Sequence, residues 1–284
     1  MASIWLELNT IFASGEISMF DHEKAIKIRK EIVRAVADYN MIEPGDRLMV
    51  CVSGGKDSSV LLALLTEIQR RAERKFEIEA VILDQKQPGF DASAFQKWIE
   101  ALGVKLTVIE RDTYSIVTEK VKDGTYCSLC SRFRRAILYD HAVSHGFTKV
   151  VLGHHRDDLI ETTMLNLFYS GKLAAMPPKL KSDDGRNILI RPLCYVSELE
   201  LADLAHAWQI PIIPCNLCGS QDGLKRKRMK KLVRDLEQEI PNIGSSIIHA
   251  LSNVKPSQLM DKDLWDFDAL RADNSAHPEE DLRV

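Results

Sequence analysis

The sequence lacks a long apolar segment. No run of apolar residues approaches the roughly 18 that a membrane-spanning helix needs. The first twenty residues include apolar positions, but they carry Glu7 and Glu16 and have no basic leader, which makes them a poor secretory signal. The sequence therefore predicts a protein without a membrane span, and we expect it in the cytoplasm.

An excess of positive charge is also missing. The formal net charge of the 284 residues is −3, so the chain as a whole does not attract nucleic acid, and a site for a polyanion requires local clusters of Lys and Arg. With 45% hydrophobic and 28% charged residues, the composition is that of a soluble globular enzyme. The length suffices for one large α/β domain with an extension, or for two modest domains.

Short apolar runs alternate with helical patterns along the first two thirds of the chain. The runs predict strands at 47–53, 79–84, 105–110, 149–153 and 187–193, with a last strand at 210–214. Apolar spacing between them predicts helices at 58–69, 92–102 and 132–144. This alternation predicts a doubly wound α/β fold with a mostly parallel sheet, in which ligands bind at the carboxyl ends of the strands.

The chain divides into four predicted parts. We expect an N-terminal extension at 1–24, a main domain at 25–220, a basic helical part at 221–268 and a disordered polar tail at 269–284. Within the main domain, a connection rich in Pro, Gly and Asp at 176–187 begins a C-terminal portion.

The common nucleotide-binding loop, Gly-x4-Gly-Lys-Ser/Thr, is absent from "CVSGGKDSSV", because Val50 stands at the first glycine and Asp57 follows the lysine. What is present is Ser53-Gly54-Gly55 after a predicted strand, then Lys56-Asp57-Ser58 opening a helix. Glycines let the backbone approach an anion, and a helix N-terminus favours negative charge. The alternative is a plain strand-to-helix turn with a cap, which needs only Gly54, Gly55 and Asp57.

Four of the six cysteines form two CxxC pairs, Cys127 with Cys130 and Cys215 with Cys218. In a reducing cytosol such pairs are more often metal ligands or redox centres than structural disulfides. The spacing alone leaves open a four-cysteine zinc site, an iron–sulfur cluster and a redox dithiol. The other two cysteines, Cys51 and Cys194, are expected to be small buried hydrophobic residues.

Polar residues follow the predicted strands, where a magnesium–ATP site would place carboxylates. The carboxylates are Asp57, Asp84, Asp157 and Asp158. Helix capping is the alternative role for Asp57 and Asp157. His154 and His155 either bind the backbone or contact the nucleotide or substrate. Of Arg132, Arg134 and Arg135, we expect one or two to point into the site and neutralise phosphate.

The loop SGGKDS resembles that of the PP-loop, or N-type, ATP pyrophosphatases, and the resemblance extends to Gly153-His154-His155-Arg156-Asp157-Asp158. These enzymes transfer AMP to a substrate oxygen and release pyrophosphate. Further strings are similar, in order, to the TtcA family of tRNA 2-thiocytidine synthetases over about residues 40–268. The strings are "CVSGGKDS", "LDQKQPGF", "CSLCSRFRRAILY", "LGHHRDD", "MPPKLKSDDGRN", "IIPCNLCGSQ" and "NVKPSQLMDKDLWDF".

The resemblance implies a HUP-like PP-loop domain at 25–220 and a set of site residues. The implied catalytic residues are Lys56, Asp57, Asp157 and Arg134. The implied ATP-binding residues are Ser53, Gly54, Gly55, Lys56, Asp57, Ser58, Asp84, Gly153 and His154, with Mg²⁺ at Asp57. It also implies an oxygen-sensitive [4Fe-4S] cluster on Cys127, Cys130 and Cys215, whose fourth iron is open to hold a sulfide for transfer. Were Cys218 a fourth ligand, no iron would be open.

The implied reaction is ATP-dependent thiolation of tRNA. AMP is transferred to O2 of the cytidine at position 32 in the anticodon loop, sulfur attacks C2, and AMP departs. A homodimer and a cysteine desulfurase as the sulfur source are implied as well. Six of the seven residues from Lys225 to Lys231 are basic, and we interpret this run as a tRNA contact rather than a merely solvated helix face. Two rivals are another PP-loop ligase or tRNA-modifying enzyme with structural zinc, and a zinc-stabilised RNA-binding module.

Overall fold

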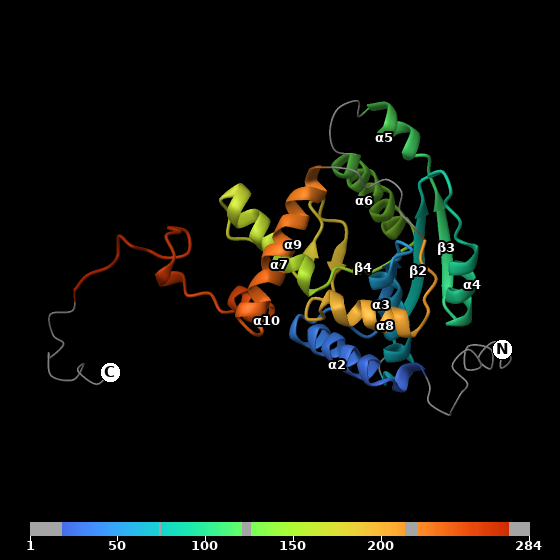
Figure 1. Cartoon of the computed structure of the whole chain (residues 1–284), viewed down its shortest axis with the longest axis horizontal. Helices are drawn as coiled ribbons and strands as arrows, with labels where there is room; N and C mark the ends of the chain where they lie inside the picture. The colour runs from blue at the N-terminus through green and yellow to red at the C-terminus, as the bar shows by residue number, and fades with distance from the viewer. Residues whose placement is uncertain (1–18, 74, 121–125, 214–220, 273–284) are drawn as a thin grey trace. The chain divides into compact units, whose positions relative to one another are not determined.

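The computed structural model describes residues 19–73, 75–120, 126–213 and 221–272 (Figure 1). The chain forms two compact units, Met1–Ile248 and His249–Val284. The first contains the sheet. The described part of the second contains the 3₁₀ helix η3 (Pro256–Gln258) and exposed large apolar side chains, among them Met260 and Leu270.

A six-stranded sheet forms the centre of the first unit, in the order β3-β2-β1-β4-β6-β5. The strands are β1 (Arg47–Cys51), β2 (Glu77–Asp84), β3 (Lys105–Glu110), β4 (Lys149–Leu152), β5 (Lys179–Lys181) and β6 (Ile188–Ile190). Every neighbouring pair is parallel except β5 with β6. The predicted α/β class with a mostly parallel sheet is therefore confirmed.

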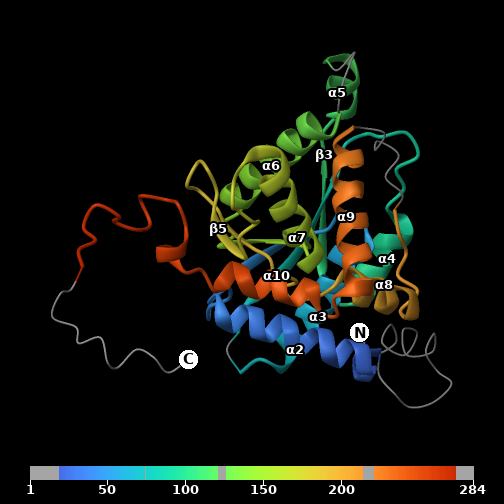
Figure 2. The ribbon, with the colours of Figure 1, turned by 60° about the vertical axis from the view of Figure 1, so that its left-hand side comes forward.

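Helices cover both faces of the sheet (Figures 1 and 2). The helical elements are η1 (Met19–Asp21), α2 (Glu23–Asp38), α3 (Lys56–Arg71), α4 (Ser93–Ala101), α5 (Tyr114–Lys120), α6 (Tyr126–Ser144), α7 (Arg156–Leu165), the π-helical turn η2 (Asn166–Ser170), α8 (Glu198–Ala207), α9 (Gln221–Glu239) and α10 (Ile243–Ser252). The larger core cluster joins one face to α2, α3, α4 and α8, and the smaller joins the other face to α6.

The alternation of β1 explains this two-sided burial. Leu48 and Val50 belong to the larger core cluster, whereas Met49 belongs to the smaller one, as the period of two in a strand requires. On the larger side, residues 58–67 of α3 are all buried, because this helix contacts the strands and also α8. Helix α3, which follows β1, is thus packed between the sheet and α8.

The expected strand at 210–214 is wrong for its described residues, 210–213, which have no regular structure. Pro211 has no N–H to donate to a ladder, and Ile213 instead donates its backbone N–H to Gly54 O at 2.9 Å. The connection at 176–187 contains β5, which pairs with β6 as a hairpin. Helix α6 begins at Tyr126, well before the expected residue 132, and therefore includes the first CxxC pair.

Residues at the start of the described chain pack into the core. Phe20 is 3% exposed and meets Trp208 edge to face, with 5.9 Å between ring centroids. The Trp208 indole N–H donates to Met19 O at 3.2 Å. Part of the predicted extension 1–24 is thereby joined to α8. Among the described residues, no helix is both long and apolar enough to cross a membrane.

Candidate nucleotide site at the carboxyl edge of the sheet

The strand order reverses between β1 and β4, which are parallel neighbours from which the sheet grows in opposite directions. Ligands of doubly wound folds bind at this point, beyond the carboxyl ends of the strands. The segments that follow β1 and β4 lie against each other here. A Cβ added at Gly153 would be only 3.0 Å from the backbone Cα and N of Ser58, so the two segments approach as closely as glycine allows.

The loop after β1 is shaped by its own serines. Ser53 N–H donates to Ser58 Oγ at 3.2 Å, and Gly55 N–H donates to Ser53 Oγ at 3.3 Å. Gly54 adopts φ +77°, in the left-handed region that favours glycine. Gly55 is the N-cap of α3 and supplies no capping side chain, so a bound anion can serve this helix start.

Lys56 occupies the first turn of α3 and contacts two carboxylates. Its Nζ lies 3.2 Å from Asp57 Oδ1 and 3.5 Å from Glu198 Oε1. Burial acts to lower the pKa of Lys56, but these two carboxylates raise it above its ordinary value. The lysine is therefore charged, as a phosphate-binding group must be. Asp57 Oδ1 is buried and, apart from this ion pair with Lys56, makes no hydrogen bond among the described residues, which fits a carboxylate oxygen that can also face a metal cation.

Asp157 joins α7 to α8, because its Oδ2 accepts the backbone N–H of Glu198 at 2.7 Å. Burial acts to raise the pKa of Asp157, but the contact with His155 and this N–H lower it to about 2. His155 Nδ1 lies 3.6 Å from Asp157 Oδ2, and this contact raises the pKa of His155 against the effect of burial. Asp157 is thus an ionised carboxylate that positions the start of α8, consistent with the capping alternative.

His154 differs from its neighbour. Burial lowers the pKa of His154 to about 4, so the ring is neutral near pH 7. Its Nδ1 is buried and has no hydrogen-bond partner among the described residues. A buried polar atom without a partner fits a ligand contact better than the backbone-binding alternative.

The end of β2 contributes Asp84 and Gln85. Asp84 Oδ1 accepts the Lys86 N–H at 2.7 Å, and Lys86 Nζ lies 3.1 Å from its Oδ2, so this carboxylate is paired locally. The Cys130 thiol is buried and donates to Gln85 Oε1 at 3.0 Å, which fastens α6 to the same edge of the sheet. Cys127 lies three residues earlier on α6.

The other predicted cluster ligand, Cys215, and its neighbour Cys218 lie outside the described residues. Among the residues that are described, no group of three or more potential metal-ligating side chains is found. The buried Cys130 thiol at the carboxyl edge nevertheless offers the soft donor that an iron–sulfur cluster or zinc requires.

Arg134 is the one of the three predicted arginines that is partly buried, and it acts electrostatically on Cys51 at the end of β1. Its charge acts to lower the pKa of the Cys51 thiol, although burial dominates and raises that pKa to about 12. Arg132 and Arg135 are exposed. Cys194 is 1% exposed, as expected of a small hydrophobic residue, whereas Cys51 is only partly buried.

Sequence reasoning missed Glu198 and the direction in which the basic helix faces. Arg226 of α9 lies 3.5 Å from both Asp158 Oδ1 and Glu161 Oε2, and Lys230 Nζ forms an ion pair with Glu198 Oε2. Figure 2 shows α9 alongside α7. The capping box from Ser197 to Glu200 is a sequence signal for the start of α8, but nothing in it locates Glu198 at the loop.

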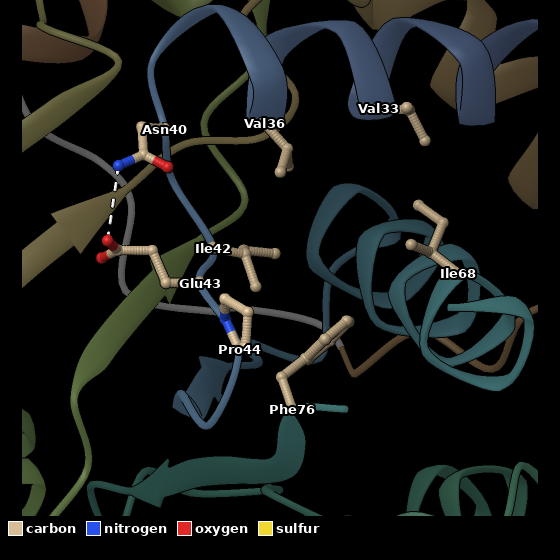
Figure 3. Close-up of a pocket in the computed structure, with 8 residues that line it drawn as sticks. All are labelled: Val33, Val36, Asn40, Ile42, Glu43, Pro44, Ile68 and Phe76. Atoms are coloured by element: carbon tan, nitrogen blue, oxygen red, sulfur yellow. Dashed lines mark hydrogen bonds between the residues drawn. The ribbon is translucent and has the colours of Figure 1, made fainter. Parts of the chain in front are cut away.

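A groove in the described surface lies at the opposite edge of the sheet. It has a volume of about 340 Å³ and is lined mainly by apolar side chains of α2, α3 and the segments that enter β1 and β2 (Figure 3). Because Pro44 and Phe76 lie within three residues before the starts of β1 and β2, the groove is at the amino edge and is separate from the candidate nucleotide site.

The PP-loop domain model matches residues 24–214, which defines the class of the protein. A tRNA-cytidine(32) 2-sulfurtransferase of Bdellovibrio bacteriovorus is 70% identical over 252 residues, covering 89% of this chain and 97% of the relative. A Hahella chejuensis protein of the same name is 53% identical over 254 residues, covering 89% of each chain. The chain therefore belongs to the tRNA-cytidine(32) 2-sulfurtransferase family of PP-loop proteins.

A solved structure has the same fold. The U34-tRNA thiolase of Methanococcus maripaludis, determined with its [4Fe-4S] cluster, superposes with a TM-score of 0.66 at 20% identity, covering 82% of this chain and 80% of that one. This likeness supports the PP-loop fold described above.

Proposed function

We propose that this protein is an ATP-dependent tRNA-cytidine sulfurtransferase that converts the cytidine at position 32 to 2-thiocytidine. The observation that carries the proposal is the 70% identity to a sulfurtransferase of that name over nearly its whole length. The SGGKDS loop at the β1/β4 crevice supplies the phosphate chemistry that such a reaction needs. The rival ligase is not favoured, since the relatives bear the name of a sulfurtransferase.

In the proposed reaction, cytidine O2 attacks the α-phosphorus of ATP and pyrophosphate leaves. The Ser53–Ser58 loop and Lys56 bind the β- and γ-phosphates. Asp57 would hold Mg²⁺, which when bound would offset negative charge on the phosphates. Arg134 of α6 stabilises the adenylated oxygen, and neutral His154 orients the nucleotide through its Nδ1, which has no hydrogen-bond partner among the described residues.

Sulfur then attacks C2, and AMP departs with the original oxygen. When bound, a [4Fe-4S] cluster with one open iron supplies this sulfur. We assign its ligands to Cys127, Cys130 and Cys215. Two observations support a position near the loop: the Cys130 thiol contacts the end of β2, and Ile213, two residues before Cys215, bonds to Gly54.

The proposed partners follow from the chemistry. The substrate is tRNA, whose loop bases unstack at less cost than those of a duplex and so reach a recessed site. We further propose a cysteine desulfurase as the upstream sulfur source, a homodimer, and a cytoplasmic location.

The experiment combines metal analysis with genetic complementation. Protein purified without oxygen should be brown, absorb broadly near 400 nm and contain iron and sulfide. Cys127→Ala, Cys130→Ala and Cys215→Ala should each lose the cluster and fail to restore 2-thiocytidine to tRNA in a deletion strain, whereas Cys218→Ala should retain both in part. Lys56→Ala and Asp57→Ala should keep the cluster but lose activity.

Two outcomes would contradict parts of this scheme. A colourless protein with stoichiometric zinc would remove the cluster, and equal loss for all four cysteine variants would indicate four-cysteine ligation without an open iron. The ATP step is tested separately from the cluster. The Lys56 and Asp57 variants are compared in protein whose cluster content has been measured, so a loss of activity at full cluster content is assigned to the ATP step.

A further inference from the structure

The basic helix α9 presents two faces with different surroundings. Arg226, Lys230 and Arg234 recur every four residues, so they lie on one face, and each contacts a carboxylate of α7 or α8. Lys227 and Arg228 are exposed, and Lys231 pairs only within its own helix, with Asp235 at 2.7 Å, as far as the described residues show. The run that resembles a plain RNA-binding stretch therefore also faces the nucleotide site.

Glu198 lies between Lys56 of the nucleotide loop and the basic helix α9. One carboxylate oxygen, Oε1, lies 3.5 Å from the Nζ of Lys56, and the other, Oε2, pairs with Lys230, with Arg234 at 3.9 Å. The backbone N–H of Glu198 is fixed by Asp157 at 2.7 Å. Burial acts to raise the pKa of Glu198, but Lys230 and Lys56 outweigh it, so the pKa is lowered and the group is an anion at neutral pH.

The Glu198 carboxylate next to Lys56 competes with ATP for this lysine. In the described structure Lys56 contacts Asp57 and Glu198, and both its contacts are carboxylates. Phosphates entering the loop would have to share Lys56 with Glu198 and would be repelled by any uncompensated charge on it. Lys230 offsets the charge of Glu198 by pairing with the other carboxylate oxygen, Oε2.

We propose that Glu198 competes with the phosphates of ATP for Lys56, and that Lys230 of α9 neutralises Glu198 so that Lys56 can turn to these phosphates. Glu198 and Lys230 are then positioning residues, and α9 sets the affinity for ATP as well as facing tRNA. This inference rests on the proposed function, since it takes ATP to be the ligand of the loop.

The test measures binding of a non-hydrolysable ATP analogue with Mg²⁺ to the full-length protein without tRNA. Lys230→Met removes the charge but keeps most of the apolar stem, and it should raise the Kd about tenfold, because Glu198 then keeps Lys56. Lys231→Met, the matched control one residue along, removes the same charge from a side chain that is 77% exposed, and its Kd should stay within about twofold of the wild type.

The second part of the test uses Glu198→Gln, which removes the negative charge next to Lys56. It should tighten analogue binding, since Lys56 is released, and in the Glu198→Gln background the further change Lys230→Met should have almost no effect on the Kd. Lys230→Arg keeps the positive charge that Lys230→Met removes, so it should retain most of the wild-type affinity for the analogue. A structural role alone would make the two single changes add, which the double variant distinguishes.

Equal effects of Lys230→Met and Lys231→Met would overturn the inference, as would a Lys230→Met effect that persists at full size with Gln at 198. If Lys230→Met fails to fold, Glu198→Gln alone decides, because weaker or unchanged binding contradicts the release of Lys56. A wild-type protein that does not bind the analogue would instead refute the proposed function. Binding by the wild type without coupling would refute only the inference.

Discussion

At the scale of single residues, Gly54 is the position where backbone conformation and packing act together. Its φ of +77° costs an L-residue roughly 1–2 kcal/mol. A Cβ at Gly54 would also lie 2.6 Å from Ile213 Cβ, so alanine would push the segment 210–213 away from the loop. The conformation and the contact together explain why the loop needs glycine here.

We expect Gly54→Ala to lower the free energy of unfolding by more than the strain alone and to weaken binding of an ATP analogue at least tenfold. Gly89→Ala is the matched control, because φ is +81° there but nothing lies within 4 Å of the added Cβ. Urea unfolding and analogue titration of both variants measure the two effects. Equal stability losses with intact analogue binding would refute the importance of the Ile213 contact.

At the scale of elements, the outward side of α9 is the proposed tRNA contact. We expect Lys227→Ala with Arg228→Ala to weaken tRNA binding and to reduce the slope of log K against log salt by roughly 1 per lost phosphate contact. Lys30→Ala with Lys97→Ala removes the same charge from exposed positions on α2 and α4. Filter binding from low to moderate salt should show a changed slope only for the α9 pair.

The elements also show what sequence can and cannot predict. Five of the six strands, β1 to β4 and β6, are predictable because each is a short β-branched or apolar run that pairs in parallel with a neighbouring strand. The run at 210–214 has the same composition, but Pro211 has no N–H to donate. Ile210 donates its N–H to Ala205 O and Ile213 donates its N–H to Gly54 O, so the described residues 210–213 do not form a strand. Local pattern carries no information about such a partner.

The candidate site shows the same limit, because local sequence pattern does not reveal contacts between distant segments. Residues close in sequence to the strand ends, such as Lys56 and His154, can be predicted as site residues because topology brings strand ends together, and their roles stay predictions. Glu198 was missed since its role depends on two lysines that are distant from it in sequence, Lys56 and Lys230. The roles of Asp84 and Asp157 stay predictions, and the structure adds that Asp84 pairs with its near neighbour Lys86 while Asp157 accepts the backbone N–H of the distant Glu198.

At the scale of the whole first unit, a buried ion pair joins the segment before β1 to the start of β4. Lys149 at the start of β4 lies 3.2 Å from Asp46 Oδ1, and the two side chains are only 9% and 8% exposed. Asp46 also accepts the Thr148 hydroxyl and the Glu43 N–H, at 2.7 Å each. Removing Lys149 would leave the Asp46 carboxylate buried without a counter-ion.

We therefore expect Lys149→Met to lower the free energy of unfolding by about 3–5 kcal/mol. Lys27→Met is the comparison, since Lys27 pairs with Glu200 at 2.7 Å but is 69% exposed, and an exposed pair contributes about 1 kcal/mol or less. Adding Asp46→Asn to Lys149→Met should recover part of the loss. Chemical denaturation of the four proteins tests this, and similar losses for Lys149 and Lys27 would contradict it.

The sheet order has a consequence for synthesis of the chain. Strands β1, β2 and β3 pair with one another and leave the ribosome early, whereas β4, the other neighbour of β1, and then Glu198 and Lys230 emerge much later. At about 5–20 residues per second, Lys56 waits roughly ten seconds or more for its partners on α8 and α9. During translation the loop therefore exists before Glu198 and Lys230, and the nascent chain acquires these proposed partners of Lys56 only after the last strand, β6, has emerged.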